Sequence, residues 1–360
     1  MKPYRLRLPG PTAVPERVRE AMARPMLSHR GAEFREIFVS TARMLQPIIG
    51  TTRHVFFFAS TGTGMMETAL VNTLAPGERV LVVIHGQFGE RFASIAEAMG
   101  ARVDRLETEW GLAPDVSAIE ARLREREYRA VVAVHNESST GVAGPIAEIG
   151  TLLRGRQELL LVDSVSGLGG MEMRMDEWGV DVLASSSQKC LMCPPGVGIA
   201  AMSAKAWEIV RRDDRMPRYY LDLRRAMESA EKLETPFTTP VTLVAGLNEA
   251  LTMMHAEGLP QVLARHERLS KRLRDGCAAL GMPSFARERL SNTVVALDVP
   301  GRGKELVRVM YQRHASVIAG SRNHLSGRVI RIGTMGAVTD EDIQTDLEHL
   351  ASCPANPASA

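Results

Sequence analysis

The 360-residue sequence lacks the long apolar runs and the excess of one charge that mark several classes of protein. No apolar run approaches the ~20 residues that a membrane-spanning helix needs. The first residues, MKPYRLRLPGP, contain no apolar core of a secretory signal. The net charge is +2, so no broad field attracts nucleic acid or a membrane surface. We therefore predict a cytoplasmic protein whose partners are neither membranes nor nucleic acids.

Cysteine is also scarce. The chain has four cysteines (Cys190, Cys193, Cys277 and Cys353), too few for a disulfide framework in a chain of this length. Cys190 and Cys193 form a C-x-x-C motif, but a zinc site needs a second ligand pair at matching spacing. A redox motif would open a helix directly after a strand, without a lysine beside it. We therefore expect reduced thiols and no metal site.

One short basic run interrupts this balance of charge. It consists of Arg211, Arg212, Arg215 and Arg218, interleaved with Asp213 and Asp214. Because the acids offset the arginines locally, we predict a solvated loop or helix end rather than a site for a polyanion.

What the sequence does contain is a regular alternation of apolar and amphipathic segments. With 45% apolar residues it has an ordinary globular composition, and its length suits about two or three domains. Short apolar runs, rich in β-branched residues and without polar alternation, predict strands covered on both faces. These runs are VFFFA (55–59), VLVVI (80–84), RAVVAV (129–134), ELLLVD (158–163), VDVLA (180–184) and GIAAM (198–202). Amphipathic stretches at 89–100 and 114–128 separate them, so we predict an α/β fold with an open, mainly parallel sheet.

The pattern changes near Pro240. Helical segments at 241–257 and 259–280 lead to two shorter strand candidates, TVVALDV (293–299) and RVIRIG (328–333). This order predicts a smaller α+β domain that follows the large one. We therefore divide the chain into an N-terminal arm (1–15), a large domain (16–255), a small C-terminal domain (256–352) and a tail (353–360).

The residues that follow the predicted strands carry the chemistry, because ligands of open α/β sheets bind beyond the carboxyl ends of the strands. STGTG (60–64) opens a helix and can seat a phosphate, although a tight turn also explains it. Phe88 offers a flat face or is a buried aromatic. HNESSTG (135–141) supplies hydroxyls, Asp163 a carboxylate, and Lys189 either a reactive amine or a surface lysine.

Pyridoxal phosphate requires this combination of groups. Its aldehyde needs an amine, its phosphate needs backbone donors and hydroxyls, and its ring needs a stacking partner. Its pyridine nitrogen stays protonated only beside a carboxylate. The converging residues therefore indicate a site for this cofactor.

Five segments closely resemble the class V aminotransferases of fold type I. They are STGTGMMETAL, HGQFGER, HNESSTG, LLLVDSVSGLGG and SSSQKCLMCPPGVG. The likeness extends from PGPTAVP near the N-terminus to RVIRIGTMG near the C-terminus. It is closest to the alanine–glyoxylate, serine–pyruvate and serine–glyoxylate transaminases, and it implies a seven-stranded large domain and a homodimer.

The resemblance assigns a role to each matching residue. Lys189 corresponds to the lysine that forms the Schiff base, and Asp163 to the partner of the pyridine nitrogen. The remaining cofactor contacts implied are Thr61, Gly62, Thr63, Phe88, Ser138, Val165, Gln188 and, from the partner subunit, Thr238. The substrate contacts implied are Gly10, Ser138 and Arg331, of which Arg331 could instead be an exposed strand residue.

Some positions depart from the family pattern. Phe88 stands where many members carry tryptophan, and Thr235 stands where some carry a tyrosine. Arg30, in SHRGAEF, either borders the active site or pairs on the surface. We predict a transaminase that moves an amino group from a small L-amino acid of the alanine or serine type to glyoxylate or pyruvate. The alternatives are a 2-aminoethylphosphonate transaminase, a lyase or desulfurase of the same fold, and a non-catalytic binding module.

Overall fold

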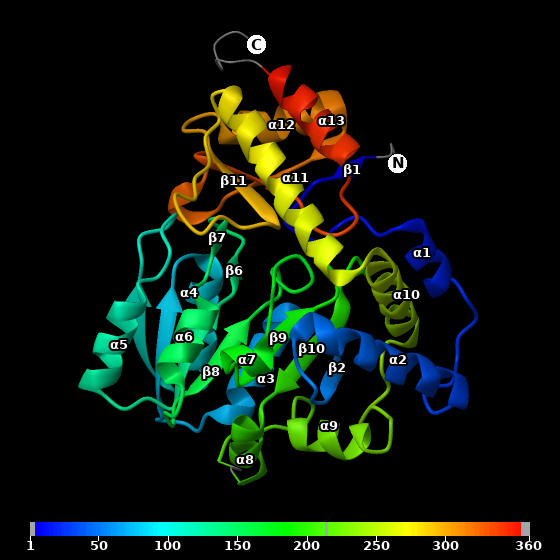
Figure 1. The fold of residues 1–360 in the computed structure, drawn as a ribbon, viewed down its shortest axis with the longest axis vertical. Coiled ribbons are helices and arrows are strands. Elements are labelled where there is room, and N and C mark those ends of the chain that lie inside the picture. The colour runs from blue at the N-terminus through cyan, green and yellow to red at the C-terminus, as the bar shows by residue number, and fades with distance from the viewer. Residues whose placement is uncertain (1–3, 213–214, 354–360) are drawn as a thin grey trace.

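The computed structural model describes residues 4–212 and 215–353, which form a large mixed sheet with helices on both faces and a C-terminal unit beside it (Figure 1). The large sheet has seven strands. Their spatial order is β2 (Val55–Ser60), β10 (Gly196–Met202), β9 (Val182–Ser186), β8 (Leu159–Asp163), β5 (Ala130–Val134), β3 (Arg79–Ile84) and β4 (Arg102–Glu107). Only β10 runs against its neighbours, so the other six strands end at the same edge.

The six apolar runs of the sequence correspond to six of these strands, and the predicted α/β fold is confirmed. The prediction omitted β4 because its sequence, RVDRLE, carries four charged residues. β4 lies at the sheet edge, where it pairs only with β3 and none of its residues is fully buried. An edge strand of this kind needs no continuous apolar sequence.

Two layers of helices bury the two faces of the large sheet. One apolar core packs the sheet against α2 (Ala32–Ile49), α5 (Val116–Glu125), α6 (Ile146–Leu153), α7 (Met175–Trp178) and α10 (Val241–Glu257). The other packs it against α3 (Gly62–Thr73), α4 (Gln87–Ala98), α8 (Ala204–Arg212) and α9 (Leu223–Ala230). Alternate residues of each strand enter opposite cores, which explains why both sets of side chains are apolar.

The C-terminal unit has its own apolar core. It consists of α11 (Leu259–Ala279), α12 (Gly303–His314), α13 (Asp340–Ala351) and an antiparallel sheet in the order β11 (Val294–Asp298), β14 (Val329–Gly333) and β13 (Ala319–Gly320). The short helix η1 (Asn323–Leu325) lies between β13 and β14. The start of the described chain joins this unit, because β1 (Arg5–Leu6) pairs with β12 (Ser316–Val317) near α13 (Figure 1).

The remaining elements are α1 (Glu16–Met22) and the hairpin of β6 (Asn136–Glu137) and β7 (Val142–Ala143). The sequence-based domain division stays a prediction. Its main boundary, at 255/256, falls in the last turn of α10, and residues 354–360 lie outside the described part of the chain. No helix among the described residues is long and apolar enough to cross a membrane. All four cysteines are buried free thiols.

Candidate active site

The shared edge of the six strands brings a carboxyl and an amine together. Asp163 is the last residue of β8, and its side chain is almost fully buried. Burial raises the pKa of Asp163 to about 7, with a smaller upward contribution from Glu137, while the Val165 amide and Lys189 act in the opposite direction. The Val165 amide donates to Oδ1 of Asp163 at 2.8 Å. The carboxyl is therefore held rigidly at a site where its charge needs a cation.

Lys189 lies in the loop that follows β9. Burial lowers the pKa of its amine to about 8, against the effect of Cys190 and Asp163. Its Nζ donates a hydrogen bond to the carbonyl of Pro9. Gly10 has φ +113°, and a Cβ there would lie 2.7 Å from Cε of Lys189, so only glycine fits beside this amine.

The segment STGTG forms the N-terminus of α3 at the same edge. Thr61 caps the helix by accepting from the Gly64 amide at 3.2 Å. A Cβ on Gly62 would lie 2.6 Å from Val165 and 3.1 Å from Oγ of Ser186, so the helix end packs closely against both residues. The first amides of the helix point to the strand ends, which makes this turn a seat for an anion.

Two buried polar atoms beside this turn have no hydrogen-bond partner among the described residues. They are Oγ of Ser186 and Oε1 of Gln188. Because unpaired buried polar atoms cost free energy, they indicate that a polar ligand belongs at this position. Together with the helix N-terminus and Thr63, they fit a phosphate group. The sequence-based set contains all of these residues except Ser186.

Phe88 lies half-buried in the first turn of α4, with the guanidinium of Arg91 4.8 Å from its ring centroid. Arg91 also donates to Oγ1 of Thr63 at 3.1 Å. The arginine therefore connects the aromatic ring with the predicted phosphate seat, and the sequence analysis did not assign it. Its signal was present in the segment HGQFGER, one helical turn after Phe88.

Glu137 is a second residue that sequence reasoning missed. Its fully buried carboxylate accepts hydrogen bonds from the amides of Phe88 (2.9 Å) and Gly89 (3.2 Å), and from Oγ of Ser139 at 2.5 Å. Burial raises the pKa of Glu137, and these hydrogen bonds oppose the shift. Glu137 thus fixes the start of α4 and the position of Phe88. The acid in HNESSTG was the signal, but the polar residues on either side made the segment look uniformly polar.

Arg331 connects the C-terminal unit to this edge of the large sheet. From β14, its Nη1 donates to the carbonyl of Ser138 at 3.2 Å, and its Nη2 donates to the carbonyl of Gly320 at 2.8 Å. Burial lowers its pKa, and its Nε has no partner among the described residues. The alternative of an exposed strand arginine is therefore wrong.

The structure does not bring every predicted residue together. Thr238 is exposed in the loop between α9 and α10, and within the described chain it forms no hydrogen bond to the rest of the set. Arg30 donates to Glu234 at 2.7 Å and to the carbonyl of Thr235 at 2.8 Å, as its surface-pairing alternative requires.

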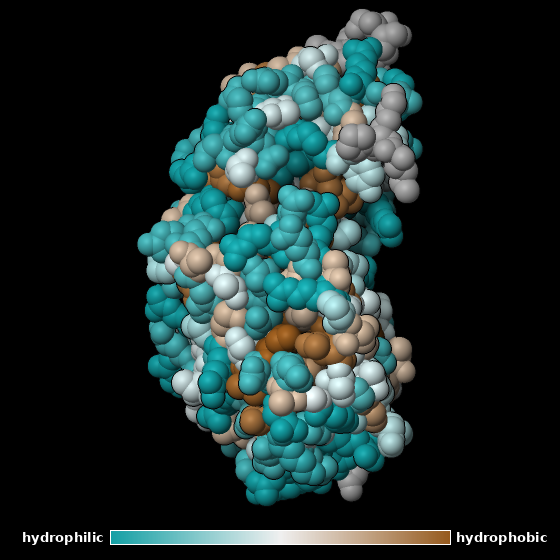
Figure 2. All heavy atoms as spheres, turned by 90° about the vertical axis from the view of Figure 1, so that its right-hand side faces the viewer, coloured by the Kyte–Doolittle hydropathy of each residue, from teal (hydrophilic) through white to brown (hydrophobic). Residues whose placement is uncertain are grey.

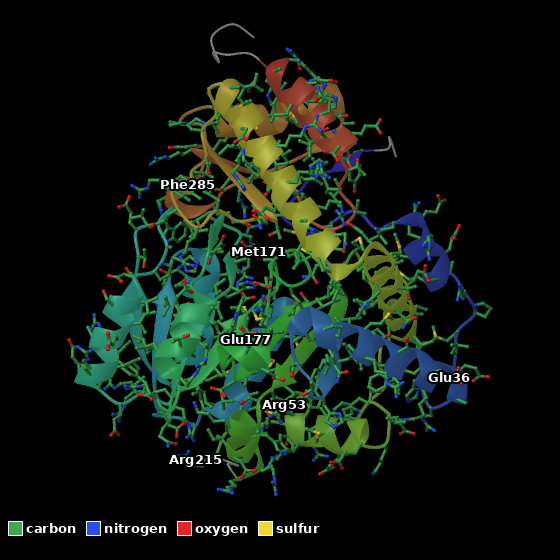
Figure 3. All side chains as sticks on the ribbon, viewed as in Figure 1. Glu36, Arg53, Met171, Glu177, Arg215 and Phe285 are labelled. Atoms are coloured by element: carbon green, nitrogen blue, oxygen red, sulfur yellow. The ribbon has the colours of Figure 1, made fainter. Side chains whose placement is uncertain are left out.

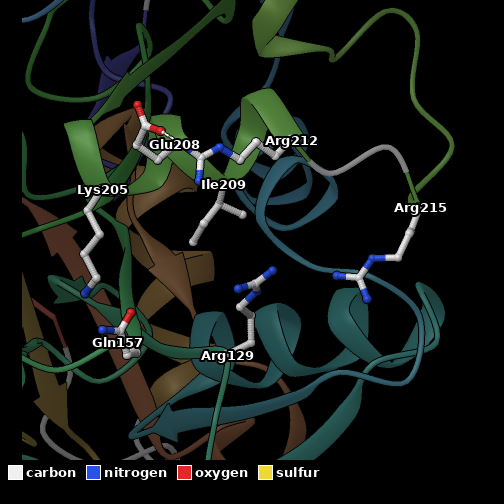
Figure 4. Close-up of a pocket in the computed structure, with 7 residues that line it drawn as sticks. All are labelled: Arg129, Gln157, Lys205, Glu208, Ile209, Arg212 and Arg215. Carbon is white, nitrogen blue, oxygen red and sulfur yellow. Dashed lines mark hydrogen bonds and ion pairs between the residues drawn. The ribbon is translucent and has the colours of Figure 1, made fainter.

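The opposite edge of the sheet carries a basic hollow of about 870 Å³ (Figure 4). Figure 3 shows Arg215, one of its residues, at the end of the molecule remote from Phe285 of the C-terminal unit. The hollow is lined by Arg129, Gln157, Lys205, Glu208, Ile209, Arg212 and Arg215. Its cations have carboxylate partners: Arg212 pairs with Glu208 at 2.7 Å, and Arg129 pairs with Glu78 at 3.2 Å.

The basic run of the sequence contributes to this hollow. Arg211 and Arg212 end α8 with exposed side chains, as predicted, whereas Asp213 and Asp214 lie outside the described residues. The prediction was wrong for Arg218, whose side chain is only 2% exposed and donates to the carbonyl of Val71 at 3.2 Å. Backbone carbonyls and the buried carboxylate of Asp222, 3.6 Å from Nε of Arg218, take the place of solvent there.

Comparisons with known proteins place this arrangement in context. The model of the aminotransferase class-V family matches residues 10–345. The chain is 37% identical to the L-aspartate–glyoxylate aminotransferase of Paracoccus denitrificans, over 92% of this chain and 86% of that protein. It is 36% identical to the serine–glyoxylate aminotransferase of Arabidopsis thaliana, over 94% and 86%. The crystal structure of alanine–glyoxylate aminotransferase from Nostoc sp. superimposes with a TM-score of 0.94 at 29% identity, covering 98% of this chain and 95% of that one.

Proposed function

Because the chain belongs to the class-V aminotransferase family, we propose that it moves an amino group from a small L-amino acid to glyoxylate or pyruvate with pyridoxal phosphate as cofactor. The observation that carries the proposal is the nearness of a buried carboxyl, Asp163, to an amine, Lys189, whose pKa burial lowers to about 8; each of the two groups acts on the pKa of the other. Both lie beside an anion seat at one edge of the sheet. The named activities of the relatives support glyoxylate as the acceptor.

The residues at this edge fit the proposed cofactor group by group. The start of α3, with Thr61, Gly62 and Thr63, would hold the phosphate together with Gln188. Phe88 and Val165 would cover the ring, Asp163 would bind the ring nitrogen, and Lys189 would bind the aldehyde. When bound, pyridoxal phosphate supplies an electron sink that makes the α-hydrogen of an amino acid acidic.

The lowered pKa of Lys189 suits the two tasks proposed for it. An amine with a pKa of about 8 is partly neutral near pH 8, so it can act as a nucleophile toward an aldehyde. Once released, the same Nζ can take the α-proton of the substrate and return it to another carbon as a general base and acid. Burial lowers the pKa of the amine, and Cys190 and the carboxylate of Asp163 oppose this shift.

Asp163 is proposed to keep a positive charge on the cofactor ring. Its carboxyl has a raised pKa because it is buried, and a cationic N–H group would stabilise the ionised form at this position. Glu137 is a second buried acid that contributes to the raised pKa of Asp163, and it holds Phe88 in place by accepting a hydrogen bond from the Phe88 amide. Arg331 is proposed to bind the substrate carboxylate with its planar guanidinium. Ser138, whose carbonyl contacts Arg331, and Gly10 would line the same space.

We further propose that the active unit is a homodimer in which Thr238 of one chain completes the phosphate seat of the other. An exposed aromatic group supports this proposal. Tyr219 is 63% exposed, and the ring of Tyr220 stacks on Phe237, the residue before Thr238, with 5.1 Å between centroids. Exposed apolar groups of this kind mark protein interfaces. Figure 2 shows further apolar surface on the side that carries α1, α2 and α10. Met26, between α1 and α2, is 71% exposed.

The cysteines bear on the desulfurase alternative and on the predicted location. A desulfurase needs a nucleophilic cysteine on a mobile loop, whereas Cys277 is fully buried in α11 and Cys353 is also buried. The four free thiols support the predicted cytoplasmic location, because they suit a reducing compartment.

The proposal is tested by adding pyridoxal phosphate to the purified chain and following its visible absorption. Alanine, serine, aspartate and 2-aminoethylphosphonate are each offered with glyoxylate or pyruvate. We expect a visible band that a carboxylate donor shifts and that glyoxylate restores. Failure of every donor to change the band would contradict the proposed activity, and a response to aminoethylphosphonate alone would replace the proposed substrate class.

A further inference from the structure

An N-terminal segment of the chain contacts both the C-terminal unit and Lys189. Residues 5–12, which we call the arm, begin as β1 and continue along β14. The amide of Arg7 donates to the carbonyl of Val317 at 2.9 Å, and the carbonyl of Arg7 accepts from the amide of Gly333 at 2.8 Å. Gly333 ends the strand that carries Arg331. The arm is therefore tied to the strand of the proposed substrate-binding residue.

The other end of the arm surrounds the proposed catalytic lysine. Nζ of Lys189 donates to the carbonyl of Pro9, and Oγ1 of Thr12 donates to the carbonyl of Lys189 at 3.0 Å. The amide of Thr12 donates to the carbonyl of Gln188 at 3.1 Å. Gly10 leaves room for the lysine side chain between these contacts. Both the backbone and the amine of Lys189 therefore depend on where the arm lies.

A buried ion pair anchors the arm between these two ends. Nε of Arg7 donates to Oδ2 of Asp346 on α13 at 2.6 Å, and the two side chains are 4% and 0% exposed. Arg5 adds a second contact to the same carboxylate at 3.1 Å. Apolar residues of similar volume often stabilise a fold as well as a buried ion pair does. What the pair adds is a fixed position, because the short charge-assisted bond from Nε holds the buried arginine against one carboxylate oxygen.

We propose that Arg7 and Asp346 are positioning residues that hold the arm so that the Pro9 carbonyl orients the amine of Lys189. This inference rests on the proposed role of Lys189 as the reacting amine. A carbonyl acceptor favours the protonated amine and aims its N–H bonds. The other groups that act on this amine are Asp163, Cys190, Arg91 and Arg331, and none of them belongs to the arm.

The test removes both charges at once, with Arg7→Met and Asp346→Leu in one protein, so that no unpaired charge stays buried. In the cofactor-free protein, each lysine is acetylated with trace acetic anhydride across neutral to alkaline pH, and peptide mass spectrometry gives its titration midpoint. We expect the midpoint of Lys189 to fall by about one pH unit, because its acceptor is lost. Lys271, an exposed lysine on α11, is the internal reference and should not change.

Hydrogen exchange provides the local readout. The amide of Thr12 should exchange faster in the double variant, because its bond to Gln188 depends on the arm. The matched control removes another ion pair of the C-terminal unit, Arg328 with Asp298, by Arg328→Met and Asp298→Leu. This control should leave the Lys189 midpoint at the wild-type value. Arg7→Lys, which keeps the charge but loses the Nε contact, repeats the test if the double variant does not fold.

Either of two results would overturn the inference. One is an unchanged Lys189 midpoint while the Thr12 amide exchanges faster, since the ion pair would then act on the arm alone. The other is an unchanged midpoint together with unchanged exchange. Acetylation reports on the amine whether or not it reacts with a cofactor, so the proposed catalytic role of Lys189 can fail separately.

Discussion

The two edges of the large sheet carry charged residues that are compensated in different ways. At the carboxyl edge, Asp163 and Lys189 are held in an environment that shifts both pKa values toward neutrality, and polar atoms of Ser186 and Gln188 lack partners among the described residues. At the opposite edge, the cations of the basic hollow meet carboxylates: Arg212 pairs with Glu208, and Lys205 lies 3.4 Å from Asp181.

This contrast distinguishes groups that need a ligand from charged groups that are already satisfied by one another and by solvent. Exposed ion pairs contribute little free energy and satisfy one another, so the hollow requires no ligand to explain its charges. Buried groups that lack full compensation are costly, and a fold keeps them where a ligand completes them. The volume of a hollow is therefore a weaker guide to function here than the state of the groups that line it.

The largest expected effect comes from replacing one lysine at each edge with alanine and comparing the two variants. Lys189→Ala should lower turnover by at least about 10⁴-fold, because it removes both the nucleophile and the base. Lys205→Ala, at the basic hollow, should keep turnover within about twofold, since Asp181 retains its hydrogen bonds from Ser203 and the Leu160 amide. Steady-state rates with one donor and glyoxylate give both values. Equal losses in the two variants would abolish the contrast.

Asp163→Asn should have the next largest effect. Asparagine keeps the shape of the side chain and the acceptor for the Val165 amide, but it cannot balance a protonated ring nitrogen. We expect turnover to fall by about 10²- to 10³-fold while the thermal midpoint stays close to that of the parent protein with cofactor. A variant with parental turnover would show that the acid at this edge does not act on the cofactor.

Arg331→Lys should lower kcat/KM for carboxylate donors by about 10- to 100-fold, because lysine keeps the charge and loses the paired N–H groups. The cofactor spectrum should not change. Arg328→Lys is the matched control, since Arg328 lies just before the same strand and pairs with Asp298 at 2.8 Å. Arg331 would lose its proposed role if both variants kept the parental kcat/KM.

The pH dependence of stability gives a smaller but independent test of Asp163. Its pKa is raised from 3.8 to about 7 on folding, so the folded protein binds this proton more tightly than the unfolded chain does. The contribution of Asp163 to the stability of the cofactor-free protein should therefore fall as pH rises from about 4 to 7. Above pH 7, Asp163→Asn should be more stable than the parent protein by about 4 kcal/mol, and this gain should vanish near pH 4. Denaturant titrations at several pH values measure it; a gain independent of pH would contradict the assignment.

The smallest effect is expected in the basic hollow. Arg212 is 79% exposed and pairs with a half-exposed glutamate, so Arg212→Ala should change the free energy of unfolding by less than about 0.5 kcal/mol. Turnover should stay within about twofold of the parent. A large loss of either would mean that this edge also carries function.

The difference between the edges also explains which features the sequence could predict. Strands buried on both faces need continuous apolar runs, so six strands of the large sheet were recognisable, whereas the exposed edge strand β4 was not. Asp163 stood out because a charge at the end of such a run is unusual, and Lys189 because it is a single lysine in the polar loop that follows one. In the C-terminal unit the same periodicities located α11, β11 and β14, whereas α12, α13, β12 and β13 were not predicted.

Contacts between distant segments could not be read from local patterns. Glu137 acts on the amides of Phe88 and Gly89, which lie 49 and 48 residues away, and no periodicity reports that distance. The same holds for Arg7, whose partner Asp346 is 339 residues away. Arg218 looked solvated because it belongs to a basic run interleaved with acids, yet one of its acceptors is the carbonyl of Val71, 147 residues away. Sequence reasoning identified the strand ends, and packing determined what lies between them.

The most direct test of the central claim is to identify the lysine that binds the cofactor. The protein is loaded with pyridoxal phosphate, reduced with borohydride and digested, and the modified peptide is identified by mass spectrometry. We predict a single stoichiometric label on Lys189 and none on Lys205 at the basic hollow. Modification of Lys205, or uniform partial labelling of the exposed lysines with Lys189 unmodified, would contradict the assignment of the active site to the carboxyl edge of the sheet.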